Sequence, residues 1–286
     1  MNNIVKHKKK KPFPIGQIIL VLILIGVCVV WLIPIWSMIE TSLHTDDAFK
    51  FYGPDYVDEA LSFKTYESVL SGASGQPVAR WFFNSLTVAT LSTVLTVLID
   101  SLAAFGYARL KFKGRDFIFG ALMVTMMIPG VINLIPQYTI VSSLNMKNTI
   151  WALVLPGLAG VGNIFLIRQF MYSVPQDLDN AAAIDGSGKI RTYFQIILPQ
   201  IVPVLVTVAM FTFLGSWNDL LWPSLVMSDE NLTLTAGLEK LKGEYDREKA
   251  SIMAAATISA VPVLGIYLFS QKFLIQGISM SSGIKE

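Results

Sequence analysis

Gly186-Ser187-Gly188-Lys189 has the residue types of a loop that cradles a nucleotide phosphate. The phosphate-loop motif also needs a glycine five positions before its last glycine and a serine or threonine after the lysine. Ala183 and Ile190 occupy those two positions here, and no strand-like run precedes them. We therefore interpret the stretch as a turn between two helices and expect no ATP binding by this route.

Asp100 is an acid inside an apolar run, near residues 82–108. An acid within a membrane span is costly and is usually functional or paired. A proton relay would need a second ionisable group well inside another span, and the sequence offers none. We expect Asp100 to face the protein interior and to hydrogen-bond to a neighbouring span; a direct part in transport is the alternative.

Other residues that could do chemistry are few. The sequence has one cysteine, Cys28, and two histidines, His7 and His44, which lie far apart. It contains neither a Gly-x-Ser-x-Gly elbow nor a His-Glu-x-x-His zinc motif. We expect no enzyme activity, no metal site and no cofactor in this chain.

Apolar runs predict the elements that position these residues. Of the 286 residues 53% are hydrophobic and 15% charged, against about 25% charged in soluble domains. Because a bilayer core needs about 20 apolar residues per helix, the sequence predicts an all-α integral membrane protein with six transmembrane helices. Pro129-Gly130 and Pro136 predict a kink or an unwound section in the third. The predicted helices lie near residues 15–39, 82–108, 117–138, 149–171, 201–222 and 250–271.

Basic residues predict the side of the membrane on which each loop lies. The side that carries both termini and the 172–200 loop has 14 of the 22 lysines and arginines, mostly in short segments. The other eight are diluted over the 40–80, 139–148 and 225–249 loops. Short basic loops stay in the cytoplasm, so both termini are expected inside. The first apolar run is too long for a cleaved signal peptide, and we interpret it as a retained anchor.

Residues 172–200 do not have the composition of a membrane span. They contain an Ala-rich helical run, an Asp185-Gly186 break, a second helical run and a Leu198-Pro199 stop. Gly186 supplies the turn between two short helices, and small side chains let another protein approach closely. The segment is therefore predicted to dock on a soluble partner.

Polar residues gather in the second predicted span, around Pro129 in the third and at the end of the fifth. Such groups cost free energy when they face lipid, whereas helix contacts or a water-filled path satisfy them. We expect them to converge on a cavity shared with a second membrane subunit. The candidate pathway residues are Asn84, Thr87, Asp100, Asn133, Trp217, Asn218 and Asp219.

The 172–203 segment resembles the cytoplasmic EAA loop of permease subunits in bacterial ATP-binding-cassette importers. The family pattern is E-A-A-x-x-x-G, nine variable residues, then I-x-L-P, and it is matched by Asn180-Ala181-Ala182, Gly186, Ile196 and Leu198-Pro199. Further stretches resemble the carbohydrate branch, and within it the smaller permease subunit of maltose-type importers. These stretches are Thr125–Pro129, Pro175–Leu178, Ile184–Gly186, Gly215–Asp219 and Gln271–Gly277.

The resemblance implies a bacterial cytoplasmic-membrane assembly that imports a sugar, in particular an oligosaccharide. A second permease subunit forms a heterodimer with this chain, two ATPase subunits bind ATP and Mg²⁺, and an extracellular solute-binding protein touches the 225–249 loop. Nucleic acid takes no part.

A helix at 177–185 would enter a groove of one ATPase subunit. The C-terminal tail would reach the interface between the two ATPase subunits. The implied coupling residues are Asp177, Leu178, Asn180, Ala181, Ala182, Ile184, Asp185, Gly186, Leu198 and Pro199. The implied tail contacts are Gly277, Ser281, Ser282 and Gly283. Asn180 departs from the family's glutamate and removes a charge from the docking surface, and Ser281-Ser282 replace residues that are often smaller.

We divide the chain into a basic cytoplasmic tail, a first helix with a long outer loop, a core permease domain of five helices and a cytoplasmic C-terminal tail. Their bounds are 1–14, 15–81, 82–275 and 276–286. The main alternatives are an ion-gradient-driven secondary transporter and a permease for glycerol phosphate or another polyol. A secondary transporter predicts paired ionisable residues and broken helices in both halves of an inverted repeat, and the sequence indicates neither. A membrane enzyme and a structural subunit outside the pathway are further alternatives.

Overall fold

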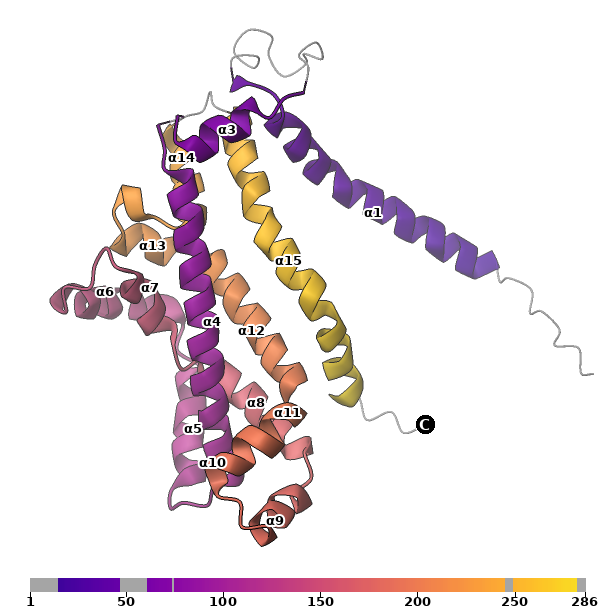
Figure 1. The fold of residues 1–286 in the computed structure, drawn as a ribbon, viewed down its shortest axis with the longest axis vertical. Helices are drawn as coiled ribbons and strands as arrows, with labels where there is room; N and C mark the ends of the chain where they lie inside the picture. Colours follow the sequence, from indigo (N-terminus) through magenta and orange to yellow (C-terminus); the bar gives the residue numbers. More distant parts are fainter. Residues whose placement is uncertain (1–14, 47–60, 74, 245–248, 282–286) are drawn as a thin grey trace, which may run out of the picture.

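A computed structural model describes residues 15–46, 61–73, 75–244 and 249–281, which form helices and turns with no strand among them. Helix α4 (Val78–Arg109) runs through the bundle from one end to the other (Figure 1). Pro77 stands just before its first residue, where a missing N–H costs no helical hydrogen bond. No proline follows within its 32 residues, so α4 is continuous.

Three helices are long and apolar enough to cross a membrane, namely α1 (Ile15–Ser42), α4 and α15 (Lys249–Ser281). Three bent pairs of shorter helical segments pass the same test together. The described chain therefore has three clear spans, and up to six if each bent pair is one span. The bent pairs are 115–125 with 130–143, 150–157 with 161–173, and 189–200 with 202–217.

The first bent pair contains the break that the sequence predicts. Helix α5 (Arg115–Thr125) ends before Pro129, and the chain resumes with the 3-10 turn η1 (Gly130–Asn133) and α6 (Leu134–Ser143). The two halves meet at 91°. Proline disfavours a helical conformation at the preceding residue and cannot donate a hydrogen bond, so the predicted break at Pro129-Gly130 is confirmed.

The second bent pair has a break that the sequence does not indicate. Helix α7 (Ile150–Val154) passes into the 3-10 turn η2 (Leu155–Gly157), and α8 (Val161–Ser173) follows at 48°. Ala159 has a φ of 60°. A left-handed residue cannot continue a right-handed helix, so the path bends there.

The third bent pair lies at the predicted Leu198-Pro199 stop, and its first helical path ends at Gln200. Helix α10 (Lys189–Thr192) continues through the π-helical turn η3 (Tyr193–Ile197) into α11 (Leu198–Gln200). Pro199 lies in the first turn of α11, where a proline is tolerated. The chain turns only at Ile201, by 81°, into α12 (Val202–Trp217). Because α12 ends at Trp217, it is also shorter than the predicted 201–222 helix.

Short elements cover the two ends of the bundle (Figure 1). One end carries α3 (Lys64–Ser71), α13 (Leu221–Val226) and α14 (Leu234–Glu244), with the 3-10 turn η4 (Asp229–Asn231) before α14. The opposite end carries α9 (Asp177–Ile184).

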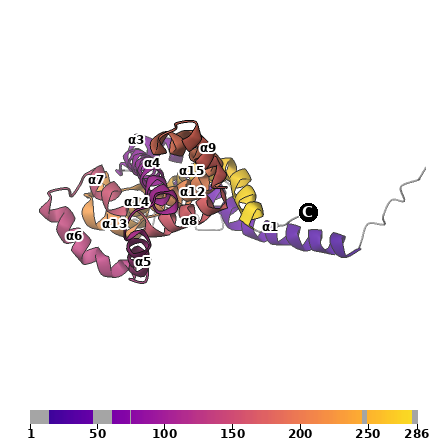
Figure 2. The same ribbon diagram turned by 90° about the horizontal axis from the view of Figure 1, so that it is seen from below.

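Helix α1 diverges from the other helices in both views (Figures 1 and 2). None of its most apolar 18-residue window is buried within the chain. At its end, Asp46 reaches the beginning of α15, where Oδ1 accepts hydrogen bonds from the N–H groups of Ala250 and Ser251 at 2.8 and 3.3 Å. Asp46 thus caps a helix that begins about 200 residues later in the sequence.

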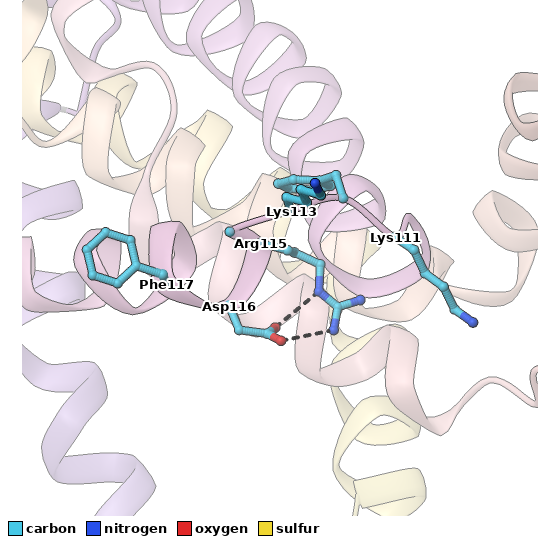
Figure 3. A pocket seen from close by; sticks show the side chains of 7 residues that line it. Lys111, Lys113, Arg115, Asp116 and Phe117 are labelled. Carbon is cyan, nitrogen blue, oxygen red and sulfur yellow. Dashed lines mark hydrogen bonds and ion pairs between the residues drawn. The ribbon is translucent and has the colours of Figure 1, made fainter.

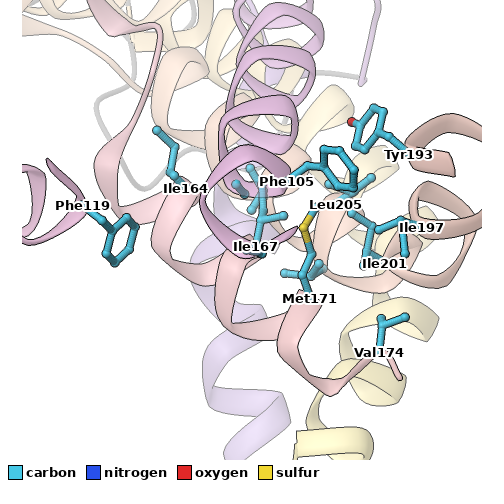
Figure 4. Packing of buried hydrophobic residues seen from close by; sticks show 14 residues of the cluster. Phe105, Phe119, Ile164, Ile167, Met171, Val174, Tyr193, Ile197, Ile201 and Leu205 are labelled. Atoms are coloured by element: carbon cyan, nitrogen blue, oxygen red, sulfur yellow. The ribbon is translucent and has the colours of Figure 1, made fainter. Parts of the chain in front are cut away.

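The core nearest α9 packs α4, α8 and η3–α12 together (Figure 4). Phe105 and Tyr193 meet with ring centroids 5.1 Å apart. Ile167, Met171 and Ile197 lie against them and are fully buried. This packing makes the C-terminal half of α4 and the segments that flank α9 one compact unit.

Candidate functional site

Helix α9 ends in a turn that requires glycine. Gly186 has a φ of 74°, which side chains other than glycine rarely adopt. The N–H of Gly186 donates to the carbonyl of Ala183 at 3.1 Å, and the N–H of Ser187 donates to that of Ala182 at 2.8 Å. This pair of bonds is the Schellman motif, which satisfies the last carbonyls of a helix. Gly186–Lys189 therefore joins two helices, as interpreted, and has no strand before it in the described chain.

Most of α9 faces outward from the molecule. Ile184 is 86% exposed and Leu178 37%, whereas Ala182 is buried at 3%. The helix therefore presents small and apolar groups at the tip of the bundle, where another protein can reach them. The remaining exposed coupling residues are Asp177, Asn180, Ala181, Asp185, Gly186 and Pro199, while Leu198 is half-buried.

Arg109, which the sequence analysis missed, fastens α9 to α4 and α8. It is the last residue of α4, and its side chain is 3% exposed. The guanidinium Nη2 donates to the carbonyls of Met171 and Val174 at 2.8 and 2.6 Å, and Nη1 lies 3.3 Å from Oδ2 of Asp179. Its partners lie far along the chain, so no local sequence signal marked it.

A basic turn joins α4 to α5 at the same end of the molecule as α9 (Figure 1). Residues 111–117 line a pocket of about 630 Å³ here, and Figure 3 shows their side chains. Arg115 pairs with Asp116 at 3.1 Å, and Nη2 of Arg168 lies 3.6 Å from the same carboxylate. These contacts hold the start of α5 against α8.

Asp100 faces the interior, as predicted, and is fully buried. It lies beside the start of α8, because a Cβ added at Gly160 would come within 3.5 Å of its Oδ2 and would also crowd the amide of Asn163. No described ion pair involves Asp100. The carboxylate thus stands at the break between η2 and α8.

The segment before α14 is bonded to the beginning of α4. Trp81 Nε1 donates to the carbonyl of Asp229 at 2.9 Å. Asn84 Nδ2 donates to the carbonyls of Asn231 and Leu232 at 3.0 and 3.2 Å, while Ser85 Oγ accepts from the N–H of Leu234 at 2.7 Å. Asn84 therefore holds a loop in this conformation, whereas Thr87 on the next turn is exposed.

Trp217, one of the candidate pathway residues, does not line an open surface of this chain. Its side chain is fully buried, with the rings of Phe82 and Phe213 each 5.7 Å away, centroid to centroid. The aromatic core of the bundle accounts for its position. Asn218 is exposed and Oδ1 of Asp219 accepts from the N–H of Trp222 at 3.3 Å, so both lie at a helix end.

Asn133 lines a groove between two of the broken spans. The groove has a volume of about 410 Å³, with α6 on one side and η2 on the other. Pro136, Gln137 and Pro156 also line it. Asn133, Asn84 and Asp100 thus belong to separate parts of the chain, and the described residues do not bring the predicted pathway together in one cavity.

The predicted tail contacts fall at the edge of the described structure. The backbone of α15 includes Gly277 and Ser281, whose side chains are outside the described residues. Ser282, Gly283 and the basic tail 1–14 also lie outside the described residues.

A family model described as "binding-protein-dependent transport system inner membrane component" matches residues 97–280, which include α9, Arg109 and the three breaks. The chain belongs to this family. Its members are inner membrane components of transport systems, so the chain is a permease subunit.

Relatives over almost the whole length support this assignment. The chain is 32% identical to a probable ABC transporter permease protein, YurM, of Bacillus subtilis, over 97% of this chain and 92% of the relative. It is 30% identical to the arabinooligosaccharides transport system permease protein AraQ of the same organism, over 96% and 97%. It is also 30% identical to the sn-glycerol-3-phosphate permease protein UgpE of Yersinia enterocolitica, over 72% and 75%.

Solved structures share the fold of this permease subunit. A chain in the crystal structure of a bacterial ABC transporter involved in the import of alginate superposes with a TM-score of 0.78. The match covers 92% of this chain and 100% of that one at 19% identity. At that identity the likeness shows the arrangement of helices.

Proposed function

We propose that this permease subunit is one half of an ATP-driven carbohydrate importer and that α9 is its dock on an ATPase subunit. The exposure of α9 at the tip of the bundle carries the proposal. Ile184 and Leu178 offer apolar contact, and Ala181 and Ala183 let another surface approach closely. The side chain of Asp179 pairs with Arg109 inside the chain, so the acids left for a partner are Asp177 and Asp185.

A second permease subunit is needed to cover the broken spans. Val131 and Ile132 in η1 are 75% and 64% exposed, and the groove that includes Asn133 opens beside them. Non-helical backbone at membrane depth is tolerated where protein or a water-filled cavity covers it, but not in lipid. This face therefore belongs to the translocation pathway between two permease subunits.

The carbohydrate class rests on the relatives. AraQ is named for arabinooligosaccharides and UgpE for sn-glycerol 3-phosphate. The match to AraQ covers 96% of this chain and the match to UgpE 72%. The oligosaccharide class therefore has the more extensive support.

Crosslinking tests the dock. With Cys28 replaced by serine, single cysteines at Asn180, Ala183 and Ile184 are each paired with cysteines on the surface of the co-expressed ATPase subunit. At least one pair is expected to crosslink, while Glu67→Cys, which lies on α3 at the opposite end, is not. An assembled complex in which every α9 pair fails would refute the dock.

Uptake into proteoliposomes tests the energy source and the substrate. Vesicles with ATP inside and no ion gradient are expected to accumulate labelled arabino-oligosaccharide when the solute-binding protein is outside. Uptake that needs an ion gradient and ignores ATP would favour a secondary transporter instead. Glycerol 3-phosphate serves as the competing substrate, and its preferred uptake would overturn the carbohydrate class.

We expect both termini and the basic 110–114 turn in the cytoplasm, with the loop before α14 outside. Because basic residues near spans stay inside, Lys113→Cys should be protected in intact cells from an impermeant thiol reagent. Glu239→Cys, exposed on α14, should react. Both should react after permeabilisation, and labelling of position 113 in intact cells would reverse the topology.

A further inference from the structure

Arg109 joins three elements through one buried cation. Its guanidinium contacts the last turn of α8 through two carbonyls and α9 through Asp179, while its backbone closes α4. The planar guanidinium holds its donors in a fixed fork that reaches acceptors on two sides, whereas the ammonium of lysine is a compact point charge without that geometry. A movement of α9 relative to α4 would have to break these contacts together.

Separation of the pair would also leave a charge without a partner in the protein interior. The Arg109 side chain is 3% exposed and that of Asp179 is 15% exposed. An uncompensated buried charge is strongly destabilising, so the state in which α9 moves and α4 stays behind is disfavoured. The two helices are therefore expected to move as one body.

The opposite end of α4 is fixed just as firmly. Trp81, Asn84 and Ser85 bind the 229–234 segment by four hydrogen bonds. A helix of this length spans about 48 Å at 1.5 Å per residue. Helix α4 thus links the outer loop to α9 with no break between them.

We propose that Arg109 is a positioning residue that makes α4 and α9 move together, so that a displacement of α9 reaches the outer loop through α4. This inference rests on the proposed function, in which an ATPase subunit moves α9 and a solute-binding protein touches the outer loop. Both partners would act on the same element, the α4–α9 unit, by favouring one of its two positions over the other.

Two substitutions separate the contacts. Arg109→Lys keeps the positive charge but loses the fork, and Asp179→Asn keeps the carbonyl contacts but removes the neutralising charge. Arg115→Lys is the matched control, because Arg115 lies on the adjoining turn and pairs with the exposed Asp116. The assay uses the complete transporter in proteoliposomes, with its ATPase subunits and its loaded solute-binding protein.

Both test variants should retain basal ATPase activity. The factor by which the binding protein stimulates that activity should fall about tenfold, a typical size for coupling between sites. Arg115→Lys should behave as wild type. Spin labels at Gln176 and Leu98, both exposed, report the motion directly. Their distance distribution should stay narrow through the ATP cycle in wild type and broaden in both test variants.

The inference would be overturned if Asp179→Asn showed both an unchanged stimulation of ATPase activity and an unchanged distance distribution. This holds even if Arg109→Lys did not accumulate in the membrane. A wild-type complex that does not assemble, or is not stimulated at all, would instead contradict the proposed function. The two failures are thus distinguishable.

Discussion

Gly186→Pro is expected to leave the subunit in the membrane and to reduce substrate uptake to background. The native φ of 74° is inaccessible to proline, which is held near −65°. The substitution also removes the N–H that donates to Ala183. Since the turn fixes the direction of α10 relative to α9, docking should fail while the spans, which lie elsewhere, still insert. Immunoblots of membranes and uptake of labelled sugar measure the two effects.

Two alanine variants serve as comparisons for the uptake of Gly186→Pro. Gly186→Ala must place a Cβ in the left-handed region, at a cost of about 1–2 kcal/mol, so uptake should be intermediate. Gly188→Ala should resemble wild type, because its φ is −71° and no atom lies within 4 Å of an added Cβ. Full uptake by Gly186→Pro would show that this turn does not orient the dock.

Gly237→Val is expected to have the largest effect on stability. A Cβ at Gly237 would overlap the six-membered ring of Trp81, which is fully buried. The ring cannot swing aside easily, since its Nε1 is bonded to the carbonyl of Asp229. Overpacking of this kind costs about 1–3 kcal/mol or more. The melting temperature of the purified subunit in detergent, and its level in membranes, should both fall sharply.

A second substitution that makes room beside position 237 should restore part of the lost stability. Trp81→Ala in the Gly237→Val background removes the overlapping ring and should raise the membrane level above that of Gly237→Val. Gly215→Ala is the control, because no atom lies within 4 Å of its added Cβ. A Gly237→Val protein as stable as Gly215→Ala would mean that α14 does not pack on Trp81.

Features set by neighbouring residues were predictable from the sequence. Pro129-Gly130 breaks a span because proline acts on the residue before it, and Gly186 ends α9 because a Schellman turn needs a left-handed residue there. Asp100 was placed in the interior because the alternative was an acid in lipid. Each of these inferences depends on the residue type and on its immediate surroundings.

Features set by distant contacts were not predictable. Arg109 meets carbonyls 62 and 65 residues later in the chain, and no local pattern states which carbonyls will be near. Trp217 was expected to anchor the span at the membrane interface or to line the pathway, and only its packing with Phe82 and Phe213 shows that it is buried. Pro199 indicates a helix end, yet neither the π-helical turn before it nor the 81° bend after Gln200 follows from residue types alone.

The Asp46 cap also imposes an order on biosynthesis. Contacts between the end of α1 and α3, such as Ser42 with Tyr66, join residues 24 positions apart and can form early in synthesis. The cap on α15 joins residues 204 positions apart. At roughly 5–20 residues per second, a ribosome needs about 10–40 s to supply the second partner. During that interval only the nearby contacts of α1 can form, and a chain that stops before Lys249 lacks the partner for Asp46.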